Sequence, residues 1–571
     1  MPEYLAPGVY VEETSFRSKS IEGVGTSTAA FVGMTARGPV TDGNQAPILC
    51  VSTTDFERLY GGMEPLTIGS RTVPNYMAHA ANAFFVNGGG RLYIARVTGA
   101  GATAGSSGMI NPEDSLAAAK RVKFDARQAG GGDITVEITR EALPSSKGLA
   151  LKQHAGTLVQ FGNHTYVIGT EPMETSAGNA NAWTGANDDA SVTILTVGVA
   201  VRDSTGTVWE AGGLGLHPSH PRYIGTQMGA EPPRSSDRLG NPVQISVGAD
   251  VDSERLYKAL LHDGASRTVT VTGGKDGTGA PSGQSYQDAF DALLAQEDVS
   301  IVAAPGSSDM AGSTPADVNQ KLIGHAEARR SYRIAVLDTP PNLSVAEAQA
   351  LKSKIDSKYA ALYYPWVRVA NPLAGTDPSA VAQLDLPPSG FVTGIYARSD
   401  VQRGVHKAPA NETVTGALDL QKQVRFGEQE VLNPLGVNCI RALPGRGIRV
   451  WGARTISSDP EWKYVNIRRY FLYLEASIDR GTQWAVFEAN GERLWANVRD
   501  TVSDFLYNEW VNGALLGSAP EQAFFVQCDR TTMTQNDLDN GRLVCLVGVA
   551  ALKPAEFVIF RIGQTTADAR S

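Results

Sequence analysis

The sequence is poor in cysteine, and this scarcity excludes a class of small, cross-linked proteins. Its 571 residues contain four cysteines, Cys50, Cys439, Cys528 and Cys545, and no two of them form a CxxC pair. A disulfide scaffold needs a far higher density, and a thiolate metal site needs close spacing. We therefore expect reduced, mostly buried thiols that act as small hydrophobic side chains, in a chain made in a reducing cytoplasm.

Long apolar runs and an excess of positive charge are also missing. No stretch approaches the ~18 consecutive apolar residues of a membrane helix, so we expect no direct membrane insertion. The chain opens with MPEY, without the basic start and apolar segment of a secretory signal, and we expect none. With 50 Lys and Arg against 59 Asp and Glu, the net charge is −9, which argues against nucleic acid as a partner.

The sequence lacks a complete nucleotide-binding motif. Gly274-Lys275 resembles the end of a phosphate-binding loop, but Asp276 follows, and a carboxylate there would repel the phosphate. Residues 99–104 (GAGATA) match a dinucleotide fingerprint after a strand, but the glycines at 105 and 108 cannot begin the helix that such a site requires. No G-x-S-x-G motif occurs, so we predict no catalytic residue and no cofactor.

Metal-ligand spacings are absent as well. His217 and His220 form the closest histidine pair, but a proline follows each, which prevents a helical ligand pair and favours a polar loop. The acidic runs 188–189 and 537–539 lack the spacing of a calcium loop and favour solvated surfaces. We therefore predict no metal site.

What the sequence does contain is enough apolar residue for large cores and many turns. Hydrophobic residues make up 42% of the chain, and at ~100–200 residues per domain there is room for roughly three or four domains. The 60 glycines are concentrated in short clusters, which indicates many short elements and a β-rich component. That component falls in 98–284, where alternating runs at 134–138 and 192–197 predict strands.

Hydrophobic periodicity predicts α/β architecture on both sides of this β-rich region. Apolar strands separated by amphipathic helices indicate a parallel sheet covered on both faces. The expected strands are 29–33, 91–97, 299–304, 332–337 and 359–369, and the expected helices are 51–60, 75–86, 288–294, 316–330 and 345–358. A different, α+β unit follows, with helices at 466–480 and 491–510 and strands at 523–526, 543–549 and 556–562.

The two chain ends carry the strongest signal for assembly. The strand 556–562 is apolar on both faces, with Phe557 and Ile559 on one face and Val558, Phe560 and Ile562 on the other. It can close its own sheet, or it can be donated to another copy. The short strand Val9-Tyr10-Val11-Glu12, tethered by the polar stretch 14–20, permits the same two interpretations.

An estimate of the free energies favours a polymer over a dimer. Burying five apolar side chains contributes about 10 kcal/mol at most. Ordering about seven residues costs roughly 7–14 kcal/mol. One donated strand is thus near neutral, and it becomes favourable when many copies exchange several strands each.

Several separate motifs, in the right order, resemble those of contractile tail sheath proteins. The longest is 386–411 (LPPSGFVTGIYARSDVQRGVHKAPAN). The others are 7–13 (PGVYVEE), 84–93 (FFVNGGGRLY), 451–455 (WGART), 462–469 (WKYVNIRR), 486–490 (VFEAN), 494–495 (LW), 513–517 (GALLG) and 554–558 (PAEFV). Together they cover roughly 4–97 and 386–562, whereas 98–284 carries little resemblance beyond the turn at 273–277.

The resemblance implies an α/β and α+β multidomain fold. A tube-proximal α+β domain is built from the N- and C-terminal segments, with β-rich and α/β outer domains inserted and with extended terminal arms. The corresponding ranges are an exchanged arm at 1–20, the core domain at 21–97 and 386–550, β-rich insertions at 98–284, an α/β domain at 285–385, and an exchanged strand at 551–571.

The resemblance also implies partners and a location. Copies of the chain would stack as hexameric rings in a helical polymer around an inner tube protein, with baseplate and tail-terminator or cap proteins at the ends. The subunit would be made in the bacterial cytoplasm and become part of a contractile particle or a virion tail. Head-to-tail contacts that do not close into a ring of fixed size generate such a helix.

With no nucleotide site, contraction would draw on free energy stored during assembly. We expect a two-state lattice in which arms stay joined, rigid domains re-dock, and segments 14–20 and 550–554 absorb the backbone change. The sequence pattern of 21–26 (IEGVGT) favours a headless injection system or phage-tail-like bacteriocin over a myovirus tail. An α/β enzyme built on 299–369 and a non-contractile structural protein remain alternatives from other classes.

Overall fold

The computed structural model describes residues 20–41, 46–111, 118–169, 183–204, 206–262, 264–310, 314–376 and 378–560. The chain divides into two compact units. The first, which we call the terminal unit, comprises Met1–Gly25, Arg403–Ala408 and Asn466–Ser571, and the second, the sheet unit, comprises Thr26–Gln402 and Pro409–Val465. Among the described helices, none combines the length and the apolar character that crossing a membrane requires.

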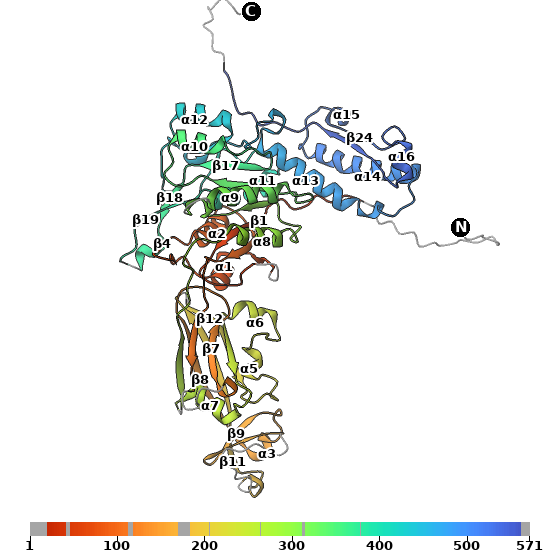
Figure 1. Cartoon of the computed structure of the whole chain (residues 1–571). Helices are drawn as coiled ribbons and strands as arrows, with labels where there is room; N and C mark the ends of the chain where they lie inside the picture. Colours follow the sequence, from red (N-terminus) through yellow and green to blue (C-terminus); the bar gives the residue numbers. More distant parts are fainter. Residues whose placement is uncertain are drawn as a thin grey trace, which may run out of the picture. The chain divides into compact units, whose positions relative to one another are not determined.

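A nine-stranded sheet forms the centre of the sheet unit (Figure 1). From edge to edge its strands are β2 (Ile48–Cys50), β5 (Arg91–Val97), β1 (Thr28–Met34), β15 (Ile301–Ala303), β16 (Ile334–Asp338), β17 (Ala360–Tyr364), β22 (Val437–Leu443), β23 (Gly447–Val450) and β20 (Glu412–Thr413). The run from β5 to β22 is parallel, and the outer strands are antiparallel. Every residue of β1, β16 and β17 is buried, as the continuous apolar runs predict.

Helices cover both faces of this sheet. On one face, Ala30 and Val32 of β1 share a core with Phe290 of α8 (Gly283–Leu293). On the other face, the Phe31 ring packs edge-on against Phe84 of α2 (Tyr76–Val86), with centroids 5.9 Å apart. The first face also receives α9 (Thr314–Glu327), α10 (Val345–Lys352) and α12 (Phe426–Leu432), and the second receives α11 (Ser389–Arg403).

The helices α2 and α11 approach each other closely because α11 carries glycine at the contact. A Cβ atom on Gly390 would lie 2.7 Å from the Cα atom of Ala80, well inside contact distance. This explains part of the 386–411 motif: a larger residue at 390 would push the helix off its neighbour.

A β-rich domain is inserted between β5 and α8, as the sequence predicts. Strands β10 (His164–Val167), β9 (Leu158–Phe161), β11 (Ser191–Asp203), β8 (Ile134–Ser146) and β14 (Ser266–Val271) form one antiparallel sheet, with β12 (Gly206–Leu214) paired to β11. Strands β13 (Val243–Val247), β7 (Val122–Ala126) and β6 (Ser106–Met109) form a second. One core lies between them and α7 (Ser253–Leu261), whose apolar stripe it buries.

The two ends of the insertion lie side by side, in a segment that we call the neck. Residues 100, 103 and 106 pair with 279, 275 and 272 through isolated bridges. The backbones are so close that a Cβ atom on Gly99 would lie 2.6 Å from the Asp276 carbonyl oxygen, which requires glycine there. The insertion therefore leaves and re-enters the sheet at one point, and β1 pairs with β15 across it.

This pairing differs from the partition expected from the sequence. The sequence predicts residues 21–97 and 285–385 in different domains, but β2, β5 and β1 from the first range adjoin β15, β16 and β17 from the second in one sheet. The sheet continues to β22 and β23, so the terminal unit begins near 466, inside the predicted core segment 386–550. The physical reason is that the six apolar strands need common neighbours to bury both faces.

Two of the predicted elements are shorter than expected. The strand predicted at 359–369 is interrupted at Pro365, which has no N–H to donate. Its second half, β18 (Val367–Ala370), pairs instead with β19 (Gln383–Leu386) and β21 (Asp419–Leu420). The helix predicted at 345–358 ends at Lys352, because Lys354 and Ile355 donate to carbonyls three residues back, in turns.

The terminal unit is built on two long helices, both confirmed close to their predicted ends. They are α13 (Val465–Gly481) and α14 (Glu492–Val511), and α15 (Pro520–Ala523), α16 (Gln535–Asp539), β24 (Phe524–Gln527) and β25 (Leu546–Val549) follow. Leu474 of α13 packs with Val498 and Phe505 of α14. The Glu509 carboxylate accepts hydrogen bonds from the Tyr470 and Tyr473 hydroxyls, at 3.1 and 2.8 Å.

A buried carboxylate in the sheet unit predicts a pH-dependent stability. The Asp338 side chain accepts hydrogen bonds from the Ser389 backbone N–H (2.8 Å) and hydroxyl (2.6 Å) at the start of α11. Burial raises the pKa of Asp338 from 3.8 to about 7 despite these bonds. Between these values the folded chain holds a proton that the unfolded chain has lost, so the free energy of unfolding falls as pH rises through this window.

We expect Asp338→Asn to remove most of this pH-dependent decrease in the free energy of unfolding. The thermal unfolding midpoint should drop less between about pH 5 and about pH 7.5 in the variant than in the wild type, because one pKa unit corresponds to about 1.4 kcal/mol. Exposed Asp291→Asn is the matched control and should keep the wild-type profile. Parallel profiles for all three proteins would contradict the prediction.

A buried arginine gives a second stability prediction. Arg333 donates to the carbonyl oxygens of Leu293 (2.8 Å), Gln296 (2.5 Å) and Val299 (3.2 Å), which end α8 and lead into β15. Arg333→Met would remove these buried hydrogen bonds, although the Leu293 and Gln296 carbonyls keep their backbone donors. We expect a loss of roughly 3 kcal/mol in the free energy of unfolding, measured by urea denaturation. Exposed Arg329→Met should change it by less than about 0.5 kcal/mol.

Candidate functional site

The residues predicted to link subunits fall into two groups. Val9, Tyr10, Val11, Glu12 and Ile562 lie outside the described residues. Phe557, Val558, Ile559 and Phe560 are described, and each is between 68% and 82% exposed.

Within the described part of the chain, residues 556–560 of the predicted strand 556–562 pair with no strand. Residues 552–560 adopt no regular structure. A strand needs a neighbour to accept its backbone hydrogen bonds, and Pro554 cannot donate one. Both interpretations of the strand 556–562 therefore stay predictions, and the structure adds that residues 552–560 extend none of the described sheets.

The segment is nevertheless anchored at its base. The Ala550 N–H donates to the Ala523 carbonyl (2.7 Å), and the Leu516 N–H donates to the Ala550 carbonyl (2.8 Å). Two residues further, Asn466 at the start of α13 donates from Nδ2 to the Leu552 carbonyl (3.1 Å). Leu552 thus fixes the chain directly before Lys553 and Pro554, and the exposed apolar run begins at Phe557.

A two-stranded sheet lies beside this anchor. Strands β24 and β25 pair antiparallel from Phe524↔Val549 to Gln527↔Leu546. Phe524 and Val526 pack on the helical core, whereas Phe525, Leu546 and Val547 are exposed. A two-stranded sheet has two edges and is marginal in stability by itself.

The loop between α13 and α14 presents a further exposed aromatic residue. Phe487 is fully exposed and has a backbone φ of +67°, which is strained for a residue with a side chain. Val486 beside it is also exposed. The motif 486–490 by itself does not predict this exposure, because a Phe between two helices is equally typical of a core residue.

The enzyme alternative predicts a ligand site at the carboxyl ends of β1 and β15, where the order of a parallel sheet reverses. The hairpin of β3 (Leu66–Ile68) and β4 (Arg71–Val73) closes over this place. Arg71 pairs with the Asp309 carboxylate (2.7 Å), which also accepts from the Tyr76 hydroxyl (2.9 Å). The remaining cavity, of about 220 Å³, is mainly apolar, and the β3–β4 hairpin forms part of its lining.

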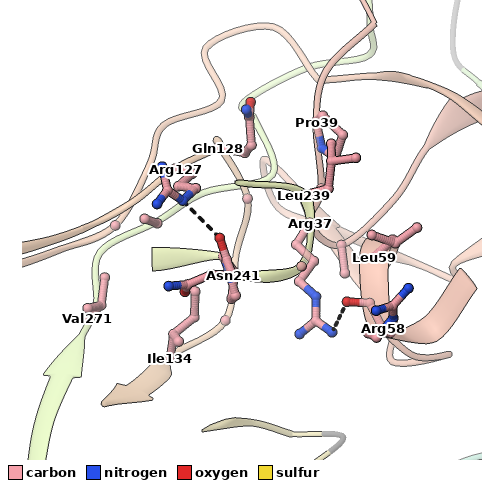
Figure 2. Close-up of a pocket in the computed structure, with 18 of the residues that line it drawn as sticks. Arg37, Pro39, Arg58, Leu59, Arg127, Gln128, Ile134, Leu239, Asn241 and Val271 are labelled. Atoms are coloured by element: carbon pink, nitrogen blue, oxygen red, sulfur yellow. Dashed lines mark hydrogen bonds between the residues drawn. The ribbon is translucent and has the colours of Figure 1, made fainter. Parts of the chain in front are cut away.

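A second cleft, at the neck, is lined by several arginines (Figure 2). Arg37 donates to the carbonyl oxygens of Glu57 (2.8 Å) and Arg58 (3.0 Å). Arg127 donates to the Asn241 (3.0 Å) and Gly229 (2.8 Å) carbonyls. These guanidinium groups therefore hold backbone segments together, and the free space measures about 50 Å³.

The glycine-rich turn at 273–277 belongs to the neck. The Asp276 carboxylate accepts from the backbone N–H groups of Gly131 (2.7 Å) and Thr67 (3.2 Å), so it fixes loops of this chain. Arg96, buried in β5, donates to the Gly38 (2.8 Å) and Ala129 (2.6 Å) carbonyls, and burial lowers its pKa to about 10.

The histidine pair lies in a polar loop. His217 and His220 each accept from a backbone N–H two residues ahead through Nδ1, at 3.2 and 3.1 Å. Burial lowers the pKa of His220. Within the described ranges, no group of three or more His, Cys, Asp or Glu side chains is arranged to hold a metal ion.

Comparison with known proteins points to one family. The sequence model of the phage tail sheath protein central domain matches residues 279–456, and that of the phage tail sheath C-terminal domain matches residues 457–565. A putative prophage major tail sheath protein of Pseudomonas aeruginosa (strain UCBPP-PA14) is 27% identical over 309 residues, which are 52% of this chain and 73% of that protein.

Solved structures share the fold over nearly the whole chain. The helical sheath of the anti-feeding prophage in its contracted state aligns with a TM-score of 0.54 and 20% identity, over 99% of this chain and 100% of that one. The PVC sheath of an extracellular contractile injection system, also contracted, aligns with 0.52 and 21%, over 99% of both chains. The two adjoining family matches span just over half of the sequence, and the chain belongs to the phage tail sheath protein family.

Proposed function

We propose that this chain is the contractile sheath subunit of a phage-like injection particle. Its copies polymerise as stacked hexameric rings around an inner tube and contract from a metastable extended state, driving the tube through a target envelope. The observation that carries the proposal is the run of four exposed apolar side chains, Phe557 to Phe560, that follows the anchor at Leu552.

The donor in this scheme is the segment that contains Phe557, Val558, Ile559 and Phe560. Four consecutive exposed apolar side chains after a fixed anchor are costly in water, and an extended segment of this kind adds readily to the edge of another sheet. The N-terminal residues 9–12, outside the described ranges, would supply a second donor.

The acceptor in this scheme is the β24–β25 sheet. It has only two strands among the described residues, and it exposes Phe525, Leu546 and Val547. Donated strands would complete it and place apolar side chains beside Phe525. Because donor and acceptor occupy different places on the subunit, such contacts propagate from copy to copy.

The energy for contraction would come from the lattice itself. Residues 553–554 connect the fixed Leu552 to the donated strand and can turn while the strand stays paired. The sheet unit, with its doubly covered sheet, would move as a rigid body between two packings of different free energy. Only interactions that differ between the two packings drive the change.

Partners beyond the chain itself would be an inner tube protein, a baseplate and a tail-terminator or cap. A myovirus tail is the alternative to a headless injection system or phage-tail-like bacteriocin. The full-length fold likeness to the sheaths of an injection system and of the anti-feeding prophage supports the headless injection system. The neighbouring genes decide it: capsid and terminase genes beside this one would overturn our choice.

Removal of either arm tests the assembly. Deletion of 1–13 or of 556–571 should leave a folded monomer that forms no sheath tubes, because each copy then lacks a donor strand. Sedimentation and negative-stain microscopy measure this, with circular dichroism as the check on folding. Normal tubes from either truncation would contradict the arm-exchange mechanism.

A full-length variant tests the donor side chains alone. Phe557→Asp combined with Ile559→Asp should abolish tubes, since two charges would enter an apolar, paired environment. The exposed apolar residue Val401 on α11 provides the control: Val401→Asp should assemble normally.

The acceptor has its own test. Phe525→Asp should reduce the yield of tubes by at least about tenfold, which corresponds to about 1.4 kcal/mol per added subunit, while the thermal midpoint of the monomer changes little. Val511→Asp, equally exposed in the same unit, should assemble as the wild type does. Equal yields from both variants would exclude the β24–β25 sheet as the acceptor.

A further inference from the structure

We propose that Cys528 and Cys545 form an oxidisable dithiol that closes into a disulfide when the protein meets an oxidising environment. The two residues immediately flank the paired strands β24 and β25. The last pair of that ladder is Gln527↔Leu546, so Cys528 and Cys545 occupy the next opposite positions. Both are thiols in the present structure.

The geometry suits a disulfide. Opposite residues of an antiparallel pair have Cα atoms about 4.5–5.5 Å apart, and disulfides span about 4.4–6.8 Å. Side chains at opposite positions of an antiparallel pair lie on the same face of the sheet, and both cysteines pack in the core of the terminal unit. The Thr532 hydroxyl donates to the Val544 carbonyl (2.7 Å) and holds the intervening loop at this point.

The other two cysteines are not placed to form a disulfide with each other. Cys50 lies on β2 and Cys439 on β22, and both are fully buried. The strands β5, β1, β15, β16 and β17 separate β2 from β22, so their thiols cannot meet in the folded sheet. They serve as internal controls.

The oxidant we invoke is a small-molecule disulfide such as oxidised glutathione. Cys545, the more exposed thiol, loses its proton and attacks the external disulfide, which forms a mixed disulfide and releases one glutathione thiolate. Cys528 then loses its proton and attacks the Cys545 sulfur, which forms the internal bond and releases the second thiolate. The two protons convert both thiolates to glutathione, so two protein thiols are oxidised and one external disulfide is reduced.

The surroundings make closure slow and the product durable. Burial raises the pKa of Cys545 to about 12, and it raises the pKa of Cys528, which Asp529 raises further and Arg499 lowers. Few thiolates are therefore present near neutral pH, and the pair stays reduced in a reducing cytoplasm. Once closed, the bond joins two poor leaving groups, which resist reduction.

Closure would fix the base of loop 529–544 and the register of β24 and β25. If this sheet accepts donated strands, a consequence that rests on the proposed function, oxidation after release from the cell would stiffen the acceptor while leaving its edges open. The disulfide itself requires no partner copy.

The test uses the purified full-length protein, reduced and then incubated in buffers of increasing oxidised-to-reduced glutathione ratio. Free thiols are alkylated, and peptides are mapped without reduction by mass spectrometry. We expect a cross-linked pair of peptides that contain Cys528 and Cys545, with a mass lower by two hydrogen atoms than the sum of the two free peptides. Cys50 and Cys439 should stay free thiols that become alkylated only when the protein is unfolded. We also expect the oxidised protein to unfold at a midpoint ~5–10 °C higher, and Cys545→Ser to lose this shift.

Two results would overturn the proposal. In one, both thiols remain free in the folded protein under a buffer that oxidises the urea-unfolded chain. In the other, Cys545 accumulates a mixed disulfide that Cys528 never resolves. Because the peptide map reads a bond within one chain, its failure is distinguishable from a failure of tube assembly, which microscopy reads separately.

Discussion

The pairing of β1 with β15 depends on bringing together two parts of the chain that are separated by the whole β-rich insertion. The neck accomplishes this: three backbone bridges, a glycine at the closest approach, and two buried charged side chains hold the outgoing and returning segments at one place. Arg96 and Asp276 bind backbone groups of neighbouring loops instead of a ligand. With the neck formed, the parallel strands gain neighbours on both sides and helices on both faces, and the sheet unit becomes one body.

Buried polar side chains elsewhere in the sheet unit also hold backbone segments together. Arg333 ties the end of α8 to β15, Arg127 gathers a run of carbonyls at the neck, and Asp338 binds the first residue of α11. The crevice where a parallel sheet ordinarily receives a ligand is closed by the β3–β4 hairpin. In the proposed function this sheet, covered by helices on both faces, moves as a rigid body, and the chain belongs to the phage tail sheath protein family.

The terminal unit has the opposite character. Its helical core is well packed, but its sheet has two strands, and the described segment that leaves it is apolar, extended and exposed. A rigid body joined by such a segment to a neighbour can re-dock without breaking the link. The same unit holds the two cysteines that flank the end of its sheet, so one small region combines the proposed linkage between subunits with the proposed response to oxidation.

The sequence by itself determined the local structure and the family. The 3.6-residue periodicity of 466–480 and 491–510 and the apolar runs at 29–33 and 332–337 predicted elements that the structure confirms, because burial of one stripe or of both faces leaves a clear pattern. The tail sheath motifs identified the relatives. Tertiary structure alone decided that 26–97 and 285–450 share a sheet, that Pro365 divides a strand between two sheets, and that Cys528 faces Cys545. Each of these depends on contacts between residues far apart in the chain, and no local pattern records which distant segments will become neighbours.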